Sequence, residues 1–186
     1  MMIITKKPTK TYTGTLCSTA EAKKQLRIES DFTDDDTYIG TLIGVARESV
    51  EDDINSDFML TSNVLEVTID GAMPTTMHVQ QSPLIAVSKI EWYNGTAWAD
   101  IPATDYTIEK YFHYFEVEFS EYYNAEKLRF TFTTGYADAD RPAKLKQAAL
   151  IRITDLYDNE RQGYNLNVTP NVAYQRLISK HVRTYW

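Results

Sequence analysis

The stretch TTGYADADRPAKLKQAA, residues 133–149, joins the two kinds of pattern that this chain contains. A β-branched run ends at Gly135, two aspartates follow at Asp138 and Asp140, and Pro142 opens a helical pattern. The stretch fits a phosphate-binding glycine loop, an Asp-x-Asp metal site or a corner between a strand and a helix. The first two interpretations predict an enzyme, and the third predicts a structural part.

The corner is the interpretation that the residues favour. A Walker loop needs a glycine-rich turn ending in Gly-Lys-Ser/Thr and a dinucleotide turn needs three spaced glycines, whereas this stretch has Gly135 alone. A calcium loop needs further oxygen ligands at fixed steps, and the residues after Asp140 are Arg141, Pro142 and Ala143. We therefore expect the two aspartates to shape the turn and to favour the start of the helix.

Before the corner, residues 64–134 read as an antiparallel β region. Alternation in VLEVTID places Leu65, Val67 and Ile69 on one face of a strand, and YFEVEF and KLRFTFTT alternate in the same way. Asn94-Gly95 in SPLIAVSKIEWYNGTAW is a strong hairpin signal, because both turn positions favour positive φ.

Helical patterns flank this β region on both sides. The capping box STAE, Ser18 to Glu21, predicts a helix over 18–28. Thr33 as the cap and the acids that follow it predict a second helix over 33–54, and Pro142 a third over 142–161 that ends near Gly163. We expect an α+β fold in which one domain, residues 16–163, combines a small bundle of three main helices with the inserted antiparallel β region.

Composition limits the classes of function. The chain has 186 residues, 43% of them hydrophobic, which suits one domain with a real core. Cys17 is the one cysteine, so no disulfide within the chain and no cysteine cluster for zinc can form. The N-terminus is too polar for a signal peptide and no run approaches the ~20 apolar residues of a membrane span, so we expect a cytosolic origin.

Charge is unevenly distributed along the sequence. Residues 1–15 and residues 164–186 each carry three basic residues and no acid, so the net charge of −7 leaves −13 for residues 16–163. We expect an acidic body with two extended terminal arms, residues 1–15 and 164–186. A body of this sign repels nucleic acid.

Residues 31–57 hold nine acids against Arg47 alone. A solvated face is the first interpretation, a wall facing another anionic body is the second, and carboxylates for a two-metal nuclease are the third. The residues proposed for an acidic face are Asp34, Asp35, Asp36, Glu48 and Asp52. The histidines, His78, His113 and His181, fall in no recognisable Ser-His or Cys-His arrangement, so we assign no catalytic residue, metal ligand or cofactor.

The C-terminal YQRLISKHVRTYW is basic and aromatic. Such a composition is typical of an anchor into a partner, because Trp, Tyr and Arg dominate interface hot spots. The equal alternative is that the segment folds back on its own body. The residues proposed for docking are Arg176, Leu177, Ile178, Lys180, Arg183, Tyr185 and Trp186.

The order of these parts resembles the head–tail connector (head-completion adaptor) family of long-tailed phages and prophages. The resemblance covers most of the chain and rests on four stretches. They are residues 18–54, the Pro-x-x-x-Val-x-x-Ile hairpin of SPLIAVSKIEWYNGTAW, the strand ending in Thr-x-Gly-Tyr with its Pro-started helix over 130–163, and RLISKHVRTYW, where His181 stands in place of a commoner tyrosine.

The resemblance implies a structural virion protein at the head–tail interface, assembled in the bacterial cytoplasm. Members form a homo-oligomeric ring of about a dozen copies on the portal, and the ring extends the DNA channel toward a stopper or tail-completion protein. DNA would pass without sequence-specific binding, and neither cofactor nor membrane is implied. The alternatives are a small metal-dependent phage nuclease or other enzyme, or a stopper or tail-completion protein of the same assembly.

Overall fold

The computed structural model describes residues 2–5, 8–159 and 171–183, and the described chain divides into two compact units. The sheet unit takes its residues from 2–13 and 57–138, and the helical unit from 14–56 and 139–183. Residues 16–163, expected as a single domain, are divided between these two units. The chain leaves the helical unit after residue 56, builds the sheets, and returns after residue 138, so the β region is an insertion as expected.

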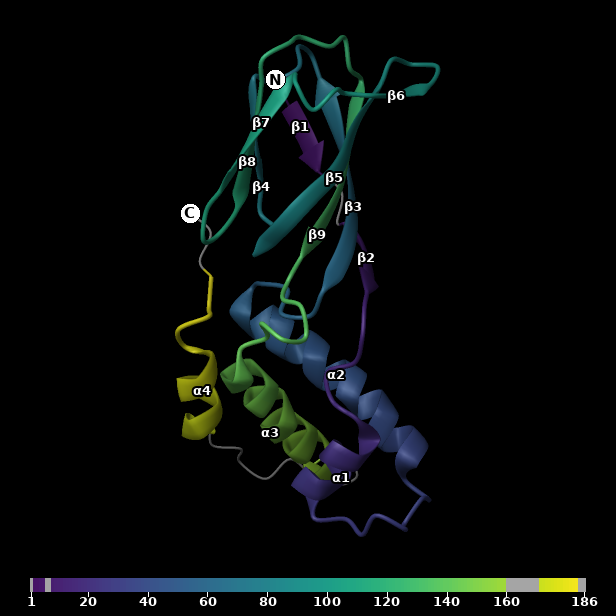
Figure 1. Ribbon diagram of the computed structural model, residues 1–186, viewed down its shortest axis with the longest axis vertical. Helices are drawn as coiled ribbons and strands as arrows, with labels where there is room; N and C mark the ends of the chain where they lie inside the picture. The colour runs from purple at the N-terminus through teal and green to yellow at the C-terminus, as the bar shows by residue number, and fades with distance from the viewer. Residues whose placement is uncertain (1, 6–7, 160–170, 184–186) are drawn as a thin grey trace. The chain divides into compact units, whose positions relative to one another are not determined.

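The larger sheet of the sheet unit is antiparallel and contains six strands (Figure 1). Their order is β1-β3-β9-β5-β6, and β2 also pairs with β3. The strands are β1 (Met2–Thr5), β2 (Thr9–Tyr12), β3 (Thr61–Asp70), β5 (Leu84–Tyr93), β6 (Trp98–Asp100) and β9 (Lys127–Thr134).

In place of the N-terminal arm expected over residues 1–15, the structure has the strands β1 and β2. β1 pairs with the second half of β3, and β2 pairs with its first half, from Thr9 opposite Val64 to Tyr12 opposite Thr61. An edge strand offers unpaired N–H and C=O groups, and the short β-branched runs of the N-terminus satisfy those of β3. Because residues 1–15 contain three lysines, the sequence pattern there indicated a polar arm and did not indicate strands.

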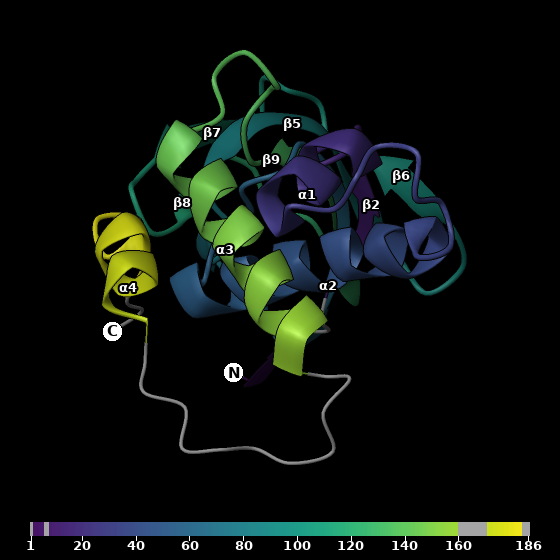
Figure 2. The ribbon, with the colours of Figure 1, turned by 90° about the horizontal axis from the view of Figure 1, so that it is seen from below.

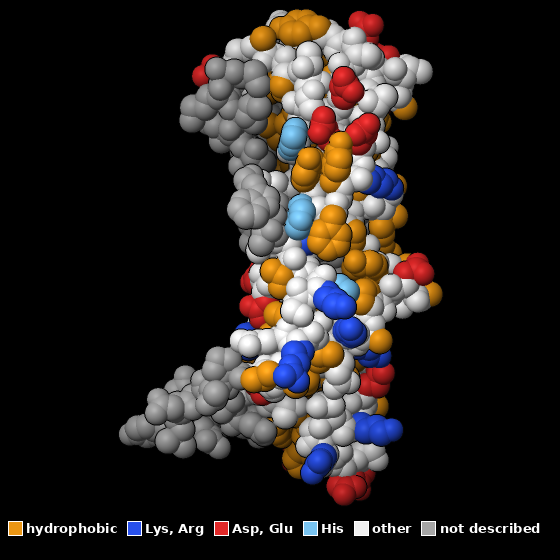
Figure 3. All heavy atoms as spheres, turned by 90° about the vertical axis from the view of Figure 1, so that its left-hand side faces the viewer, with side chains coloured by type: hydrophobic (Ala, Val, Ile, Leu, Met, Phe, Trp, Pro, Cys, Tyr) orange, Lys and Arg blue, Asp and Glu red, His pale blue; other side chains and the backbone are white. Residues whose placement is uncertain are grey.

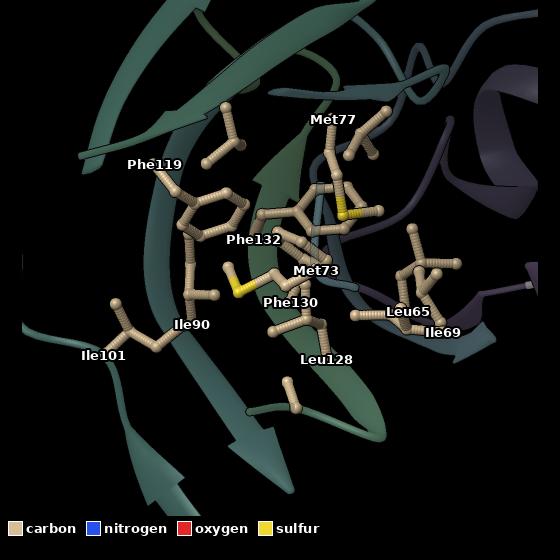
Figure 4. Packing of buried hydrophobic residues seen from close by; sticks show 14 of the residues in the cluster. Leu65, Ile69, Met73, Met77, Ile90, Ile101, Phe119, Leu128, Phe130 and Phe132 are labelled. Atoms are coloured by element: carbon tan, nitrogen blue, oxygen red, sulfur yellow. The ribbon is translucent and has the colours of Figure 1, made fainter. Parts of the chain in front are cut away.

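The second sheet contains β4 (Thr76–Val79), β8 (Phe115–Phe119) and β7 (Tyr106–Lys110) in that order. Its inward side chains share one apolar cluster with those of the larger sheet (Figure 4). Phe115 meets Phe132 at a ring distance of 5.2 Å in an edge-on contact. The core of the sheet unit therefore lies between two sheets, and the expected alternation of Leu65, Val67 and Ile69 is confirmed by their burial.

The Asn94-Gly95 hairpin is confirmed as the connection between β5 and β6, with one difference. Gly95 alone has positive φ, at 92°. The Asn94 side chain instead accepts hydrogen bonds from the backbone N–H groups of Thr96 and Ala97, both at 2.9 Å. The asparagine acts through its side chain, as in other Asx turns.

The helical unit contains four helices in the described residues (Figure 2). The expectation of three main helices is therefore corrected. α3 packs across α2, with α1 on one side of it and α4 on the other (Figure 2). The bounds are α1 (Thr19–Leu26), α2 (Asp36–Ile54), α3 (Ala143–Asn159) and α4 (Val172–Ile178).

Most predicted helix ends are confirmed to within a few residues. Ser18 and Glu21 form the expected capping box of α1. α2 begins later than expected, because the cap position is Asp35 and the Thr33 carbonyl accepts from the Asp36 N–H in a turn. The end expected for α3 near Gly163 lies outside the described residues.

Candidate functional site

The corner at Gly135 is a structural junction. Gly135 has φ of 86°, and a Cβ atom there would lie 1.9 Å from the Met59 carbonyl oxygen. The Gly135 N–H donates to the Pro83 carbonyl at 3.0 Å, and Tyr136 bridges to Met59. Glycine is therefore required by close backbone approach within the sheet unit.

The aspartates after this glycine lie in an exposed turn. Asp138 and Asp140 are exposed, and the described residues contain no group of three or more His, Cys, Asp or Glu side chains that could hold a metal ion. The Pro142 carbonyl accepts from the Leu145 N–H at 3.0 Å, so the proline starts α3 as expected. The preference for a corner over a ligand loop agrees with this geometry.

A buried polar cluster at one end of the larger sheet is a feature that sequence reasoning missed. Asp57 is 2% exposed, and its carboxylate accepts from Lys10 Nζ and from the Thr134 hydroxyl, both at 2.5 Å. Asn63 Nδ2 donates to the same hydroxyl at 2.7 Å. A buried carboxylate requires such partners, and this one ties β2 to the ends of β3 and β9. The sequence signal was weak, because Lys10 and Asp57 are 47 residues apart.

The C-terminal segment folds onto the helical unit as far as it is described. Asn171 caps α4, and the Tyr174 hydroxyl donates to Asp53 at 2.5 Å. The Arg183 N–H donates to the Ile54 carbonyl at 2.9 Å, and Asn55 Nδ2 donates to the Arg183 carbonyl at 3.2 Å. Burial, together with the bond to Asp53, raises the pKa of Tyr174. An extended arm over 164–186 is therefore wrong for residues 171–183.

The residues proposed for docking differ in how far they are buried. Ile178 and Arg183 are buried in the helical unit, whereas Arg176 and Lys180 are exposed and Leu177 is half-buried. Tyr185 and Trp186 lie outside the described residues. Near Arg183, His181 has a lowered pKa because it is partly buried and lies close to the positive charges of Lys144 and Arg183.

The residues proposed for an acidic face do not form one surface. Asp35 accepts from the Tyr157 hydroxyl and Asp36 pairs with Lys23, each at 2.5 Å, so both act inside the helical unit. Asp34 is exposed before α2, whereas Glu48 and Asp52 are exposed in its second half. About 20 Å of helix separates Asp34 from the latter pair at 1.5 Å per residue.

The connection between β7 and β8 is an exposed aromatic tip, residues 111–114. Phe112 is 56% exposed, and Tyr111 stacks on Tyr114 at a ring distance of 4.8 Å. The Tyr111 hydroxyl donates to Glu109 at 2.6 Å, which raises the pKa of Tyr111 to about 12. Figure 3 shows hydrophobic, histidine and acidic side chains on this side of the sheet unit. His113 lies in this tip between Phe112 and Tyr114.

Residues 18–99 match the model of the family described as phage gp6-like head-tail connector protein. The resemblance to head–tail connectors is confirmed. The match covers α1, α2, β3, β4, β5 and the first two residues of β6. The chain matches no curated protein.

The chain shares its fold with proteins in solved structures of GTA particles. The chain has a TM-score of 0.77 and 15% identity to a protein in the neck of an empty GTA particle computed with C6 symmetry, covering 100% of this chain and 97% of that one. It has a TM-score of 0.75 and 16% identity to a protein in the virion of a native gene transfer agent (GTA) particle, with the same coverage. A protein in the neck of a native GTA particle computed with C12 symmetry gives 0.68 and 12%, covering 96% and 97%.

No helix in the described ranges combines the length and the apolar character that crossing a membrane requires. The prominent surface features of the described chain are the aromatic tip, the exposed acids of α2, and the exposed cations Arg176 in α4 and Lys180 just after it.

Proposed function

We propose that this protein is a structural component of a virion neck, forming an oligomeric adaptor ring between the portal and the stopper or tail of a phage-like particle. The observation that carries the proposal is the match of residues 18–99 to the head-tail connector family. The fold shared with neck proteins supports it, and the C6 and C12 symmetries of those necks agree with a ring of about a dozen copies. In this role the ring extends the DNA channel and catalyses nothing.

Electron microscopy of the protein mixed with portal-bearing heads tests this proposal. We expect an added ring of density at the portal vertex, with the DNA channel continuous through it. A solution monomer is compatible with this function, because the portal can template the ring. Heads that gain no density at saturating protein would contradict an adaptor, and density that appears after another neck protein has bound would indicate a stopper or tail-completion protein.

The competing class is a small metal-dependent nuclease. The described residues offer no grouped metal ligands, which favours the adaptor. A divalent ion that binds the native state raises its stability with the logarithm of the ratio of free ion concentration to Kd. We expect Mg²⁺ and Mn²⁺ to leave the melting temperature unchanged at millimolar concentration, and a melting temperature that rises with ion concentration, accompanied by DNA cleavage, would support the nuclease.

We further propose that the C-terminal residues Tyr185 and Trp186 dock onto the portal. This docking segment is shorter than the set of residues from Arg176 to Trp186 that the sequence suggested, because Ile178 and Arg183 are covered by the chain itself. A chain truncated after Arg183 keeps α4 and its bonds to α2, so we expect a folded protein that binds portal-bearing heads weakly. The matched control is Tyr122→Ala, which removes an exposed tyrosine of the sheet unit. Normal head binding by the truncated chain would contradict the proposal.

Part of the acidic surface, in this proposal, faces the DNA channel, where like charge prevents adhesion. Asp34 is the exposed candidate at the start of α2. We expect Asp34→Lys to slow DNA passage in ejection measurements. A ring structure with a neutral or basic lumen would contradict this role.

A further inference from the structure

Charge is segregated within the helical unit. Residues 14–56, which contain α1 and α2, hold ten acids against four Lys and Arg. Residues 139–183, which contain α3 and α4, hold eight Lys and Arg against four acids. The helical unit is therefore acidic in one half and basic in the other, a distribution that favours head-to-tail association of identical copies.

The acidic half presents an uncovered helix face on α2. The buried positions of α2 recur at helical spacing through Ile39, Leu42, Ala46 and Val50, and this side faces the bundle. The opposite side carries Thr41, Val45, Glu48 and Asp52, all exposed. Val45 is 40% exposed. We call these four residues the α2 stripe.

The exposed face of α2 also carries residues without side chains. Gly40 and Gly44 flank the α2 stripe, and a Cβ atom added at either glycine would meet nothing within 4 Å. Small residues of this kind let a second helix approach closely. The carboxylate of Glu48 has one ion pair, with Arg47 at 2.7 Å, and it keeps 63% of its side chain exposed.

The basic half presents a matching stripe on α4. Val172 and Arg176 lie four residues apart on the side of α4 turned away from buried Tyr174 and Ile178, and Lys180 follows four residues later in the turn after the helix. Val172 is 55% exposed. Within the described part of the chain, neither Arg176 nor Lys180 forms an ion pair with an acid. We call Val172, Arg176 and Lys180 the α4 stripe.

The surroundings of the α4 stripe are positive as well. Lys144 at the start of α3 is exposed and lies close enough to His181 to lower the pKa of that histidine. Figure 3 shows Lys and Arg side chains gathered on the side of the helical unit where α4 lies. The charge opposite to this surface is found on the α2 stripe.

We propose that the α2 stripe of one copy packs against the α4 stripe of the next copy. In the α2 stripe Val45 is followed by Glu48 and Asp52, and in the α4 stripe Val172 is followed by Arg176 and Lys180, each time over about 10–12 Å at 1.5 Å per residue. Val45 would meet Val172, while Glu48 and Asp52 would meet Arg176 and Lys180. Because the two surfaces differ, the contact is heterologous, and a heterologous contact that closes generates a ring. The inference rests on the ring of the proposed function and names the surfaces that build it.

Disulfide trapping tests the contact directly. In the double variant Val45→Cys/Val172→Cys each copy carries both halves of the contact, so oxidation at about 1 mM protein and low salt should give a ladder of dimers, trimers and larger species. Either single variant should give dimers at most. The native Cys17 is buried and its pKa is raised to about 11 by burial, so its thiol stays protonated and unreactive. Absence of a ladder would overturn the inference.

Charge reversal tests which groups form the contact. In the double-cysteine background, both Glu48→Lys/Asp52→Lys and Arg176→Glu/Lys180→Glu should reduce the ladder by roughly tenfold, because like charges then meet. A 1:1 mixture of these two reversed chains should restore it, since each partner now offers opposite charges to the other. A ladder that survives either reversal, or a mixture that fails to restore it, would overturn the pairing.

The same variants separate this inference from the proposed function. If portal-bearing heads gain normal rings from Glu48→Lys/Asp52→Lys protein, the adaptor function stands and this interface is wrong. If wild-type protein adds no ring to such heads, the function itself is wrong. Rings lost in each reversed chain and regained in the mixture would support both.

Discussion

Asp57 in the sheet unit and the pair Glu48 and Asp52 in the helical unit are carboxylates in opposite surroundings. Asp57 in the sheet unit is 2% exposed and is held by Lys10 and Thr134. Glu48 and Asp52 in the helical unit are exposed on the outer side of α2. Burial of an unpaired charge costs several kcal/mol, whereas an exposed charge costs little and stays available for contact.

This difference indicates a division of roles. The sheet unit is built from closely fitted buried groups, with a glycine against a backbone carbonyl and a buried polar cluster nearby. The helical unit displays its charges and uses a few specific bonds to hold α4. We therefore expect stability to depend most on the sheet unit, and contacts with other molecules to depend on the surface of the helical unit.

The largest loss of stability is expected from Gly135→Ala. The added Cβ would lie 1.9 Å from the Met59 carbonyl oxygen at φ of 86°, so the backbone must move. We expect the free energy of unfolding to fall by more than about 4 kcal/mol. Urea unfolding followed by the fluorescence of Trp92 and Trp98, both in the sheet unit, measures this.

Gly71→Ala is the matched control for this change. Gly71 also has positive φ, at 102°, but a Cβ atom there would meet nothing within 4 Å. The expected loss is about 1–2 kcal/mol from the backbone conformation alone. Equal losses in the two variants would show that close packing at Gly135 contributes nothing.

The second largest loss is expected from Asp57→Ala. The substitution removes the acceptor of Lys10 and of the Thr134 hydroxyl in a buried place, which should cost about 3 kcal/mol. Asp52→Ala removes an exposed carboxylate and should change stability by less than about 0.5 kcal/mol. Similar losses from the two variants, in the same urea titrations, would refute the contrast between the units.

Local patterns in the sequence predicted much of this architecture. Alternation identified β3 and β9 because each buries one face, and the capping box identified α1 because its two bonds join residues three apart. The predictions for the two terminal segments were wrong for a physical reason. β1 and β2 are short and gain their stability by pairing with β3, and α4 gains it by packing on α2 and α3. Such long-range contacts leave no periodic signal.

The functional surfaces were predictable only in outline. The acids of residues 31–57 were recognised as a group, but the sequence does not show that Asp35 and Asp36 bind Tyr157 and Lys23 within the unit. The Asp57 cluster depends on Lys10 and Thr134, which are distant in sequence, so no motif marked it. The four aromatics of residues 111–114 were visible, but their exposure was not.

A smaller effect is expected from Tyr174→Phe, which tests how α4 is held. The variant removes the hydroxyl that donates to Asp53 at 2.5 Å and keeps the buried ring. We expect a loss of about 1–2 kcal/mol, seen as faster hydrogen exchange of the α4 amides while those of β9 are unchanged. Tyr122→Phe, at a side chain that is 65% exposed, is the control. Unchanged exchange in α4 would show that this bond does not hold the helix.

The smallest effect is a pH dependence from His181. Burial and the nearby charges of Lys144 and Arg183 lower the pKa of this histidine in the folded state, so the unfolded chain takes up its proton first as the pH falls. The stability that His181 contributes is therefore complete above the ordinary value of about 6.5 and is lost as the pH falls from there toward the lower folded value. His181→Gln should flatten the change in unfolding free energy between about pH 7 and pH 5.5, with His78→Gln as the control on the sheet unit. Because the positive surface around α4 causes part of this shift, Lys144→Gln should flatten the same change in part. An unaltered profile in both variants would mean that this surface exerts no charge effect on His181.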